Sequence, residues 1–496
     1  MKISDQILPS VAAHLRRPPS NFIDGAYREH GTGERLDVFD PATGDVIAQV
    51  PNSDGTIVDA AVKSARAAFD DGRWRYLASA DRERILLQFS ALLLDHADEL
   101  AQLETLEQGK SLPLARLFGP EAGSVWTRFA AGLATKITGR TIEPSFPGGP
   151  QRWTASTRRE AVGVVAGIVP WNLPTLIALW KIAPALAAGC SIVIKPSETT
   201  PLTALKLAEL AIAAGIPAGA FNVVTGTGST TGQALTAHPH IAKISFTGST
   251  RAGIEIGKAA MDRMARLTLE LGGKNPAIVM KDADIEQTVR GVTIGAFANQ
   301  GQVCAATSRV FVERARYGDL VDALSPIVRS MRAGPGLDPA AQVNPLASAA
   351  HQAKVLGYVD EARAAGTELI EGAPVPERGY YVAPMLALNP CLSARLVRDE
   401  IFGPVLSIEP VDSLDEAIAR TNAGIYGLGA SLWTRDLSTA MSAVPQIVAG
   451  TIWINSPPQI DPALPFGGYR QSGIGRDFGV DWLDAYLETK TICVSH

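Results

Sequence analysis

The sequence predicts an α/β fold in which parallel sheets carry helices on both faces. Between residues 160 and 280, short apolar runs alternate with segments of helical periodicity, as in chains whose parallel strands are joined by crossover helices. Glycine is abundant, with 46 residues, as expected where many strands turn tightly into helices. A length of 496 residues exceeds one ordinary core and suits two or three packed domains.

The predicted strands of this first region are short, apolar and bounded by glycine or proline. They span residues 163–169, 191–195, 221–226 and 243–248, and the predicted helices between them span 174–189, 200–216 and 230–239. Ligands of such sheets bind beyond the carboxyl ends of the strands. The motifs "PWN", "KPSE" and "FTGST" stand at these ends, so we expect them to line a ligand site.

A second α/β region is expected from about residue 273 to 450. It contains "NPAIVM", a cysteine segment, and "YVAPMLALNP" leading into "RDEIFGPVLSIEPV". Residues 139–160, rich in Pro and Gly with alternating Thr and Arg, are predicted to leave the first sheet. The strand-like C-terminus "LETKTICVSH" either pairs with that excursion or with a neighbouring subunit.

Composition and charge exclude several classes of protein. Hydrophobic residues at 46% and charged residues at 19% describe a folded globular chain, and a net charge of −5 offers no basic surface for nucleic acid or anionic membranes. Residues 1–19 lack the features of a signal peptide, and we expect a cytoplasmic protein. Residues 161–180 carry no charge, but their glycines and prolines favour a buried strand, a turn and a helix over a membrane span.

The four cysteines, at positions 190, 304, 391 and 493, lie far apart. Their spacing fits neither a metal site nor a disulfide framework, so we expect no metal and a reducing compartment. A free cysteine is usually an inert, buried small hydrophobe. Cys304, in "NQGQVCAATSR", therefore needs support from other motifs before it is taken as a nucleophile.

Two motifs are candidates for contacts with a nucleotide. "FTGSTRAG" places Gly248, Ser249 and Gly253 where a strand turns into a helix, and the helix N-terminus there could receive a pyrophosphate; a packing turn is the alternative. "IKPSE" offers Lys195 and Glu198 at a strand end. That carboxylate could accept both hydroxyls of a ribose, while the alternative is a solvated loop pair.

Glu270, in "LELGGKNP", is the candidate general base. It ends an apolar run, and a carboxylate at the end of a buried strand is costly unless it has a partner or a chemical role. Semi-buried glutamates have raised pKa values and can accept protons near neutral pH. The alternative is a glutamate at a helix N-terminus.

In this order and at these separations, "PWN", "KPSE", "LELGGK" and "GQVC" resemble the NAD(P)-dependent aldehyde dehydrogenase superfamily. "EIFGPV", "YGL" and "PFGGYRQSGIGRD" also match, and the resemblance runs from about residue 23 to 488. It implies a Rossmann-type NAD-binding domain (1–138 and 161–272), an α/β catalytic domain (273–472) and a small β oligomerisation element (139–160 and 473–496). It further implies a homo-oligomer, a tetramer or alternatively a dimer.

The resemblance also implies roles for single residues. Cys304 matches the nucleophile, Glu270 the general base, and Asn172 the amide that helps to bind the oxyanion. The matched cofactor contacts are Trp171, Lys195, Glu198, Gly248, Ser249, Gly253 and Glu400. The residues matched to the substrate tunnel are Leu173, Leu176, Trp180, Ala298, Val303, Ile460 and Phe466.

These roles predict oxidation of an aldehyde to an acid through a thiohemiacetal and a thioester on Cys304, with NAD as cofactor. A thiol with a pKa near 8.5 is a few per cent thiolate at neutral pH, so modest activation without a histidine is expected to suffice. A non-catalytic structural protein and a cofactor-independent esterase on the same fold are the alternatives. A structural protein would typically have lost some of these catalytic groups, all of which are present, and an esterase would use the same cysteine without a cofactor.

Within the superfamily the chain resembles the bacterial phenylacetaldehyde dehydrogenases, in stretches such as "VGVVAGIVPWN" and "GRDFGVDWLDAYLETK". The matched tunnel is apolar, which predicts an aromatic or otherwise hydrophobic aldehyde. Leu173 stands where many relatives carry Phe, and a Pro-Pro pair lies beside the tunnel. Both departures leave a broad-specificity or betaine-type enzyme as alternatives.

Overall fold

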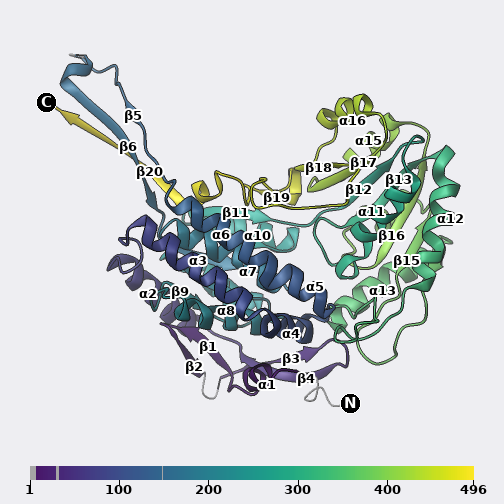
Figure 1. Ribbon diagram of the computed structural model, residues 1–496, viewed down its shortest axis with the longest axis horizontal. Coiled ribbons are helices and arrows are strands. Elements are labelled where there is room, and N and C mark those ends of the chain that lie inside the picture. The colour runs from purple at the N-terminus through teal and green to yellow at the C-terminus, as the bar shows by residue number, and fades with distance from the viewer. Residues whose placement is uncertain (1–6, 30–32, 148) are drawn as a thin grey trace.

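The computed structural model describes residues 7–29, 33–147 and 149–496. The predictions for the N-terminal segment and for the excursion at 139–160 fall partly on residues 1–6 and 148, which lie outside the described residues, as do residues 30–32. Two sheet-containing bodies stand side by side, and a long three-stranded arm projects from one of them (Figure 1).

The first body is built on an eight-stranded sheet in the order β19-β11-β10-β7-β8-β9-β1-β2. Its central strands are parallel, while β1 and β2 at one end and β19 at the other are antiparallel to their neighbours. Its strands are β1 (Ser20–Ile23), β2 (Ala26–Glu29), β7 (Val164–Ile168), β8 (Ser191–Lys195), β9 (Phe221–Val223), β10 (Ile241–Thr247), β11 (Arg266–Glu270) and β19 (Gly473–Ile474).

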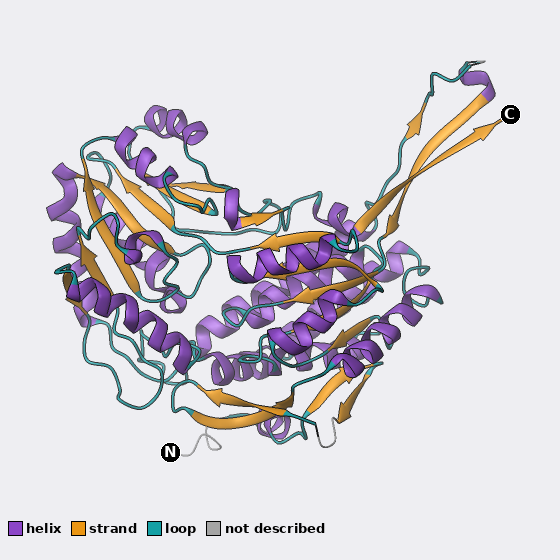
Figure 2. Cartoon of the chain, turned by 180° about the vertical axis from the view of Figure 1, so that it is seen from behind, coloured by secondary structure: helices purple, strands orange, loops and turns teal. Residues whose placement is uncertain are grey.

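The helices of this body cover both faces of the sheet, as Figure 2 shows from behind. They are α1 (Pro9–Leu15), α2 (Gly55–Asp70), α3 (Ser79–Asp95), α4 (Ala97–Gln108), α5 (Leu112–Arg116), α6 (Ala122–Ala134), α7 (Pro174–Ala187), α8 (Leu202–Ala213), α9 (Gln233–Ala237) and α10 (Thr250–Met261), with π turns η2 (Leu117–Glu121) and η4 (Gly228–Gly232). Local sequence sets their starts: the Asp54 side chain caps α2, and Pro174 opens α7.

Alternation along the strands explains the two cores. Val165, Ile192 and Ile194 pack with the apolar residues of α3, α6, α7 and α8. Their sequence neighbours Val164 and Val193 point to the other face and pack against α2. Because both faces are buried, these strands are apolar throughout, which is why the sequence predicted them.

The second body carries a seven-stranded sheet in the order β14-β15-β16-β13-β12-β17-β18, parallel except for the β14–β15 pair. The strands are β12 (Asn275–Val279), β13 (Thr307–Glu313), β14 (Glu368–Glu371), β15 (Met385–Leu388), β16 (Val405–Val411), β17 (Gly429–Trp433) and β18 (Thr451–Ile454). Apolar residues of α11 (Ile285–Phe297) and α12 (Arg314–Ser330) pack on one face, and those of α15 (Leu414–Asn422) and α16 (Leu437–Ala443) on the other.

The remaining elements are α13 (Ala349–Ala364), α14 (Arg395–Arg398) and the 3-10 turns η3 (Pro150–Arg152), η5 (Ala298–Gly301), η6 (Val444–Gln446), η7 (Arg470–Ser472) and η8 (Trp482–Tyr486). Of these, η3 belongs to the arm, and the side chains of η8 pack in the core of the first body. The predicted α/β fold with parallel-sheet domains is confirmed.

The arm consists of β6 (Trp153–Ala161), β20 (Leu487–Ser495) and the two-residue β5 (Thr141–Ile142). β20 runs antiparallel to β6 from Leu487 opposite Ala161 to Ser495 opposite Trp153. The C-terminal strand therefore pairs with the excursion of its own chain. A separate hairpin of β3 (Arg35–Asp40) and β4 (Asp45–Pro51) lies near the N-terminus. Gly473 and Ile474 belong to the first sheet rather than to the arm.

Two predicted elements are shorter than their patterns. β9 ends at Val223 because Asn21 Oδ1 accepts a hydrogen bond from Thr225 N at 2.8 Å, which takes the backbone out of the ladder. The helix predicted at 230–239 contracts to α9, preceded by the η4 turn that Thr227 caps. Residues 161–180 form β7 and the start of α7, and no helix in the described ranges is long and apolar enough to cross a membrane.

Candidate active site

Four parallel strands end at the same edge of the first sheet. Trp171 and Asn172 follow β7, Gly248 follows β10, and Glu270 is the last residue of β11. The chain then crosses directly into β12 of the second sheet, so this edge faces the second body. A cavity of about 230 Å³ lies there, between the two bodies.

Six predicted site residues line this cavity together. They are Trp171, Asn172, Gly248, Ser249, Cys304 and Glu400. Four others do not: Glu270 is buried behind it, Gly253 lies within α10, and Lys195 and Glu198 stand at the end of β8. The structure thus brings the thiol, the amide and the glycine turn into one site from segments more than 50 residues apart.

A strained turn presents Cys304 to the cavity. Asn299, Gln300 and Gly301 have φ values of 49°, 57° and 71°, three successive residues in the left-handed region. Such conformations persist only where surrounding contacts enforce them, and they concentrate at functional sites. Asn275 Nδ2 donates to Cys304 O at 2.7 Å and to Ala306 O at 3.0 Å, which fixes the backbone beyond the turn.

The Asn172 side chain is oriented by the same segment. Its Nδ2 donates to Gln302 O at 3.0 Å, which uses one N–H and leaves the other for a ligand. The backbone carbonyl of Asn172 accepts from Asn299 Nδ2 at 3.1 Å and from Lys110 Nζ at 2.8 Å. Lys110 is fully buried and also paired with Glu104. Asn172 is therefore held on both its amide and its carbonyl.

The thiol of Cys304 is protonated at neutral pH in this cavity. Burial, followed by the charges of Glu400 and Glu270, raises its pKa to about 12. The expectation of an ordinary thiol that needs only modest activation is therefore wrong for the protein without its cofactor. Two nearby carboxylates and poor hydration oppose the thiolate, and a positive charge or a base must supply the difference.

Glu270 is 5% exposed, and neither carboxylate oxygen has a hydrogen-bond partner among the described residues. Burial raises its pKa well above the usual value, and Asp477 adds to this, while Lys181 and Arg476 act in the opposite direction. Room for its carboxylate depends on Gly467, where a Cβ atom would lie 2.7 Å from Glu270 Oε1. An unpartnered buried carboxylate is what a general base for water requires.

The glycine turn joins β10 to α10. The Ser249 hydroxyl accepts from Ala252 N at 3.3 Å and so caps the helix, and both Gly248 and Ser249 line the cavity. Gly253 has a packing role: a Cβ atom there would lie 2.5 Å from Leu271 Cδ2, and Leu271 also lines the cavity. Gly253 thus acts on the cavity through Leu271.

Polar groups at two further places match the predicted ribose contacts. Lys195 is buried and its Nζ donates to Glu198 Oε2 at 3.3 Å, while the Glu198 side chain is 46% exposed. Glu400 is partly buried and accepts from Gly273 N at 3.0 Å. A Cβ atom at Gly272 would lie 2.2 Å from Glu400 Oε2, so this carboxylate needs the glycine beside it.

Three residues that sequence reasoning missed also line the cavity: His351, Lys354 and Phe402. The ring of Trp171 packs against His351 and Phe402, with centroids 4.9 and 5.3 Å apart. Burial lowers the pKa of His351 to about 4, so this ring is neutral. Phe402 lay within the quoted "EIFGPV" motif, whereas α13, which carries His351 and Lys354, had no motif.

Most of the predicted tunnel residues belong to the main apolar core of the first body or pack against it. Leu173, Leu176, Trp180 and Phe466 belong to this core, and Val303, Cys304 and Ile460 pack against it, but Ala298 does not. Two aromatic residues of the same core that the sequence did not indicate lie near Trp180. Phe478 contacts Trp180 at 4.8 Å between centroids, and Trp126 contacts Phe478 at 5.6 Å. No group of three potential metal ligands occurs among the described residues.

Comparisons with known proteins agree with this site. A model of the aldehyde dehydrogenase family matches residues 27–492. A phenylacetaldehyde dehydrogenase of Pseudomonas fluorescens is 44% identical over 494 residues, covering 99% of this chain and 98% of the relative. An aminoacetaldehyde dehydrogenase of Pseudomonas aeruginosa is 42% identical over 495 residues, covering 99% of both.

Among solved structures, an NAD⁺ complex of an aldehyde dehydrogenase from Bacillus cereus superposes with a TM-score of 0.95 at 40% identity, covering 99% of each chain. The family match and the full-length relatives show that this chain belongs to the aldehyde dehydrogenase family. The resemblance seen in its motifs is confirmed.

Proposed function

We propose that this protein oxidises a hydrophobic aldehyde to the carboxylic acid with NAD as cofactor. The observation that carries the proposal is the meeting of Cys304, Asn172 and the Gly248–Ser249 turn in one cavity. A nucleophile, an oxyanion donor and a phosphate-binding helix terminus are the three groups that this chemistry needs. The NAD⁺ complex of the relative from Bacillus cereus supports the choice of cofactor.

The residues of the cavity fit NAD. The N-terminus of α10 and the side chain of Lys354 supply positive potential for a pyrophosphate, and the missing side chain of Gly248 lets it approach. In this proposal Glu198 would accept the hydroxyls of one ribose and Glu400 those of the other. When bound, NAD supplies the acceptor for the hydride that leaves the substrate.

The chain's own groups account for the remaining steps. Cys304 Sγ loses its proton to solvent and attacks the aldehyde carbon, forming a C–S bond and moving the carbonyl electron pair onto oxygen. The free N–H of Asn172 and the backbone N–H of Cys304 stabilise that oxyanion; a single donor of this kind contributes about 3–4 kcal/mol. Departure of hydride from the same carbon leaves a thioester on Cys304.

Hydrolysis of the thioester is assigned to Glu270. Its unpartnered carboxylate takes a proton from water as the water oxygen attacks the acyl carbon, and the C–S bond breaks to return the thiolate. The raised pKa of Glu270 makes it a stronger base than an exposed glutamate. An acyl-transfer enzyme that avoids water would not need this group.

The apolar core against which Cys304 packs supports an aromatic or other hydrophobic substrate. Trp126, Trp180, Phe466 and Phe478 form a connected set of rings that would pack around an aryl group. The aldehydes in the names of the two relatives differ in charge, since phenylacetaldehyde is neutral and aminoacetaldehyde carries an amine. The apolar core favours the neutral substrate because it offers little to replace the hydration of a charge.

A panel of aryl, aliphatic, cationic and carboxylated aldehydes tests the proposal. NADH formation is followed by its near-ultraviolet absorbance, and kcat/KM is compared across the panel. We expect arylacetaldehydes to give the highest value. A highest kcat/KM for betaine aldehyde or succinate semialdehyde would refute the hydrophobic preference. Ester hydrolysis without NADH from any aldehyde would favour the esterase alternative.

We further propose a cytoplasmic homo-oligomer, a tetramer built from dimers or alternatively a dimer. The free state of all four cysteines is consistent with a reducing compartment. The arm supports the oligomer, because β20 has an unpaired edge along a sheet ordered β20-β6-β5 and exposes Ile492 and Val494. The division into an NAD-binding domain, a catalytic domain and this oligomerisation element remains part of the proposal.

A further inference from the structure

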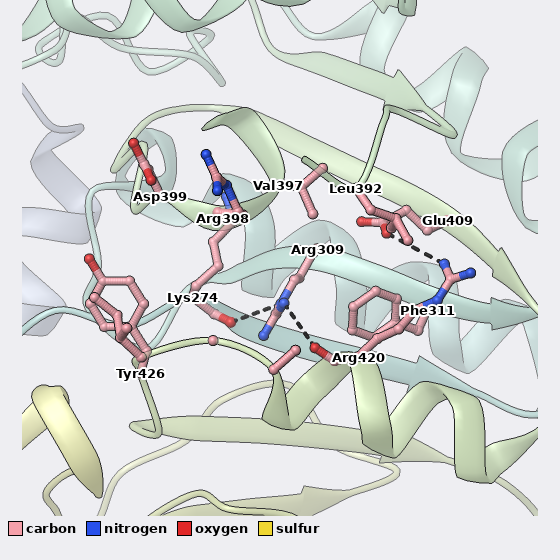
Figure 3. Close-up of a pocket in the computed structure, with 13 residues that line it drawn as sticks. Lys274, Arg309, Phe311, Leu392, Val397, Arg398, Asp399, Glu409, Arg420 and Tyr426 are labelled. Carbon is pink, nitrogen blue, oxygen red and sulfur yellow. Dashed lines mark hydrogen bonds and ion pairs between the residues drawn. The ribbon is translucent and has the colours of Figure 1, made fainter. Parts of the chain in front are cut away.

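A second cavity, of about 560 Å³, lies in the second body and shares no lining residue with the cavity of Cys304. It opens between β13 and β16 on one side and the segments 392–399 and 420–426 on the other (Figure 3). Nothing in the proposed reaction uses it. Its lining combines buried cations with exposed apolar side chains.

Two buried cations lie at its centre. Lys274 is 3% exposed, and its Nζ donates to a single acceptor among the described residues, Leu396 O at 2.8 Å. Arg309 is 7% exposed and donates to backbone carbonyls, including Lys274 O at 3.0 Å (Figure 3). In the described part of the chain no carboxylate lies within ion-pair distance of Arg309. Burying such charges is costly unless an anion accompanies them.

Both acids of the lining interact with other residues, although the charge of Glu409 also acts on Arg309 and its Oε2 has no hydrogen-bond partner among the described residues. Glu409 lies 3.7 Å from Arg420, whose other nitrogen pairs with Glu416 at 2.5 Å. Asp399 pairs with Arg395 at 3.2 Å. Arg398, also in the lining, is exposed. Four cations therefore face two acids in the lining, and the excess of two positive charges is centred on Lys274, Arg309 and Arg398.

The pKa values of the two buried cations agree with an excess of positive charge in the lining. Burial, with the nearby Arg309, lowers the pKa of Lys274 to about 7, and burial lowers that of Arg309 to about 10. Nearby carboxylates oppose both shifts, Glu409 among them, but burial prevails, so the charged forms are only partly compensated. An anion bound beside them would stabilise it.

The wall and mouth of the cavity are apolar. Phe311 is buried with its ring 5.2 Å from the Arg309 guanidinium carbon, and Val397 lies beside it. Leu392 and Ile425, each 51% exposed, also line the cavity. Large apolar side chains exposed at a concave site with convergent polar groups are typical of a ligand pocket. A small hydrophilic anion would leave them uncovered.

We propose that this cavity is a binding site for an apolar monocarboxylate, whose carboxylate lies against Lys274 and Arg398 and whose body covers Phe311, Leu392 and Ile425. An arylacetate belongs to this class, and it is what the proposed function would produce. The identity of the natural ligand rests on that proposed function. The binding itself does not, because it needs neither NAD nor turnover.

Equilibrium dialysis of the full-length protein against labelled phenylacetate tests the site. Leu392→Asp places a negative charge at the mouth, and Leu437→Asp, at an exposed leucine of α16, is the matched control. Binding in the Cys304 cavity is common to both variants. We expect Leu392→Asp to weaken the second binding event at least about tenfold and Leu437→Asp to bind like the wild type. Equal binding by all three proteins would overturn the proposal.

Competition identifies the chemistry of the ligand. Acetate and inorganic phosphate should displace phenylacetate only at concentrations about tenfold or more above that of unlabelled phenylacetate, because neither covers the apolar wall. Displacement by phosphate at equal concentration would instead show a simple anion site and refute the apolar component.

A second pair of variants guards against misfolding of Leu392→Asp. Arg398→Glu reverses a charge at the cavity, and Arg329→Glu reverses one on exposed α12; both positions are at the surface. Only the first should weaken phenylacetate binding. No aldehyde or NAD is present, so failure of the dehydrogenase proposal would leave this measurement intact.

Discussion

The thiol of Cys304 must ionise for the proposed reaction, but its surroundings oppose ionisation. The Cys304 thiol is poorly hydrated and lies near the charges of Glu400 and Glu270, so its pKa is raised to about 12. Below that value the thiol form dominates, and each unit of pH toward it increases the thiolate fraction about tenfold. A positively charged ring beside the sulfur, such as the nicotinamide of NAD, would stabilise the thiolate and lower the pKa of Cys304.

We therefore expect the rate of Cys304 alkylation by iodoacetamide to rise about tenfold per pH unit between pH 7 and 9, without a plateau. Adding NAD should move the plateau to lower pH. Mass spectrometry of the peptide that contains Cys304 gives the rate, since Cys391 and Cys493 are exposed and also react. A plateau near pH 8 without NAD would contradict the effect of burial.

Variants of the two reacting side chains separate the halves of the mechanism. Cys304→Ala should abolish NADH formation and any esterase activity, because no adduct forms. Glu270→Gln should lower steady-state turnover about 10²–10⁴-fold, the usual cost of losing a general base. Rapid mixing should still show a burst approaching one NADH per active site. Slow NADH formation without a burst would mean that Glu270 serves Cys304 and not the deacylating water.

Lys110 is a positioning residue that no motif indicated. Its Nζ donates to Asn172 O at 2.8 Å and pairs with Glu104, and both charged side chains are fully buried. Lys110→Met should destabilise the protein by about 3–5 kcal/mol, because Glu104 is left buried and unpaired. The double variant with Glu104→Leu should recover most of the thermal midpoint. It should not recover kcat, since Asn172 O still lacks its donor.

The residues that the sequence could and could not predict differ in the kind of contact they make. Cys304, Asn172 and Gly248 stand in local motifs at strand ends, and the structure brings them together. His351 and Phe478 reach the site through tertiary packing against Trp171 and Trp180. A ring that packs against a residue over 150 positions away leaves no local periodicity to detect. Gly253 was predicted as a cofactor contact from the motif "FTGSTRAG", but the side chain that lies against it is that of Leu271.

At the scale of elements, the strands buried on both faces were the most predictable. β8 spans Ser191–Lys195, as its pattern indicated, because continuous β-branched residues suit a central parallel strand. The turn before Cys304 was not predictable. Two non-glycine residues adopt positive φ there because the rest of the site enforces it, against their own preference.

We propose that the end of β8 also selects the cofactor. Glu198 pairs with Lys195 at 3.3 Å at that position, where its carboxylate would accept a ribose diol and repel a 2′-phosphate. We expect kcat/KM to be higher with NAD than with NADP, and Glu198→Gln to narrow the ratio at least about tenfold by removing the repulsion. Comparable kcat/KM for both cofactors in the wild type would show that Glu198 does not discriminate between NAD and NADP.

At the scale of the whole molecule, the arm is the one element that has no place in the hydrophobic cores of its own subunit. The arm of β6 and β20 projects away from both bodies in Figure 1 and Figure 2, and β20 is exposed along most of its length. An exposed strand edge with apolar side chains is a template for pairing with another chain, so monomers with this arm should associate. Closed symmetry would use every arm in the same way.

Val494→Asp tests this at the level of the assembly. The side chain is 46% exposed within one chain, so the change should leave the fold of each subunit intact while placing charges at the expected contact. Light scattering at micromolar concentration should give an oligomeric mass for the wild type and a lower mass for the variant. Ile254→Asp, on the exposed face of α10 at 46%, asks whether a second surface contributes. A monomeric wild type would refute the proposal, and an unchanged mass for Val494→Asp would show that the arm is not part of the interface.

If the arm acts only in assembly, the melting temperature of the isolated Val494→Asp subunit should be independent of its concentration. The melting temperature of the wild type should instead rise with concentration, because association stabilises the folded state.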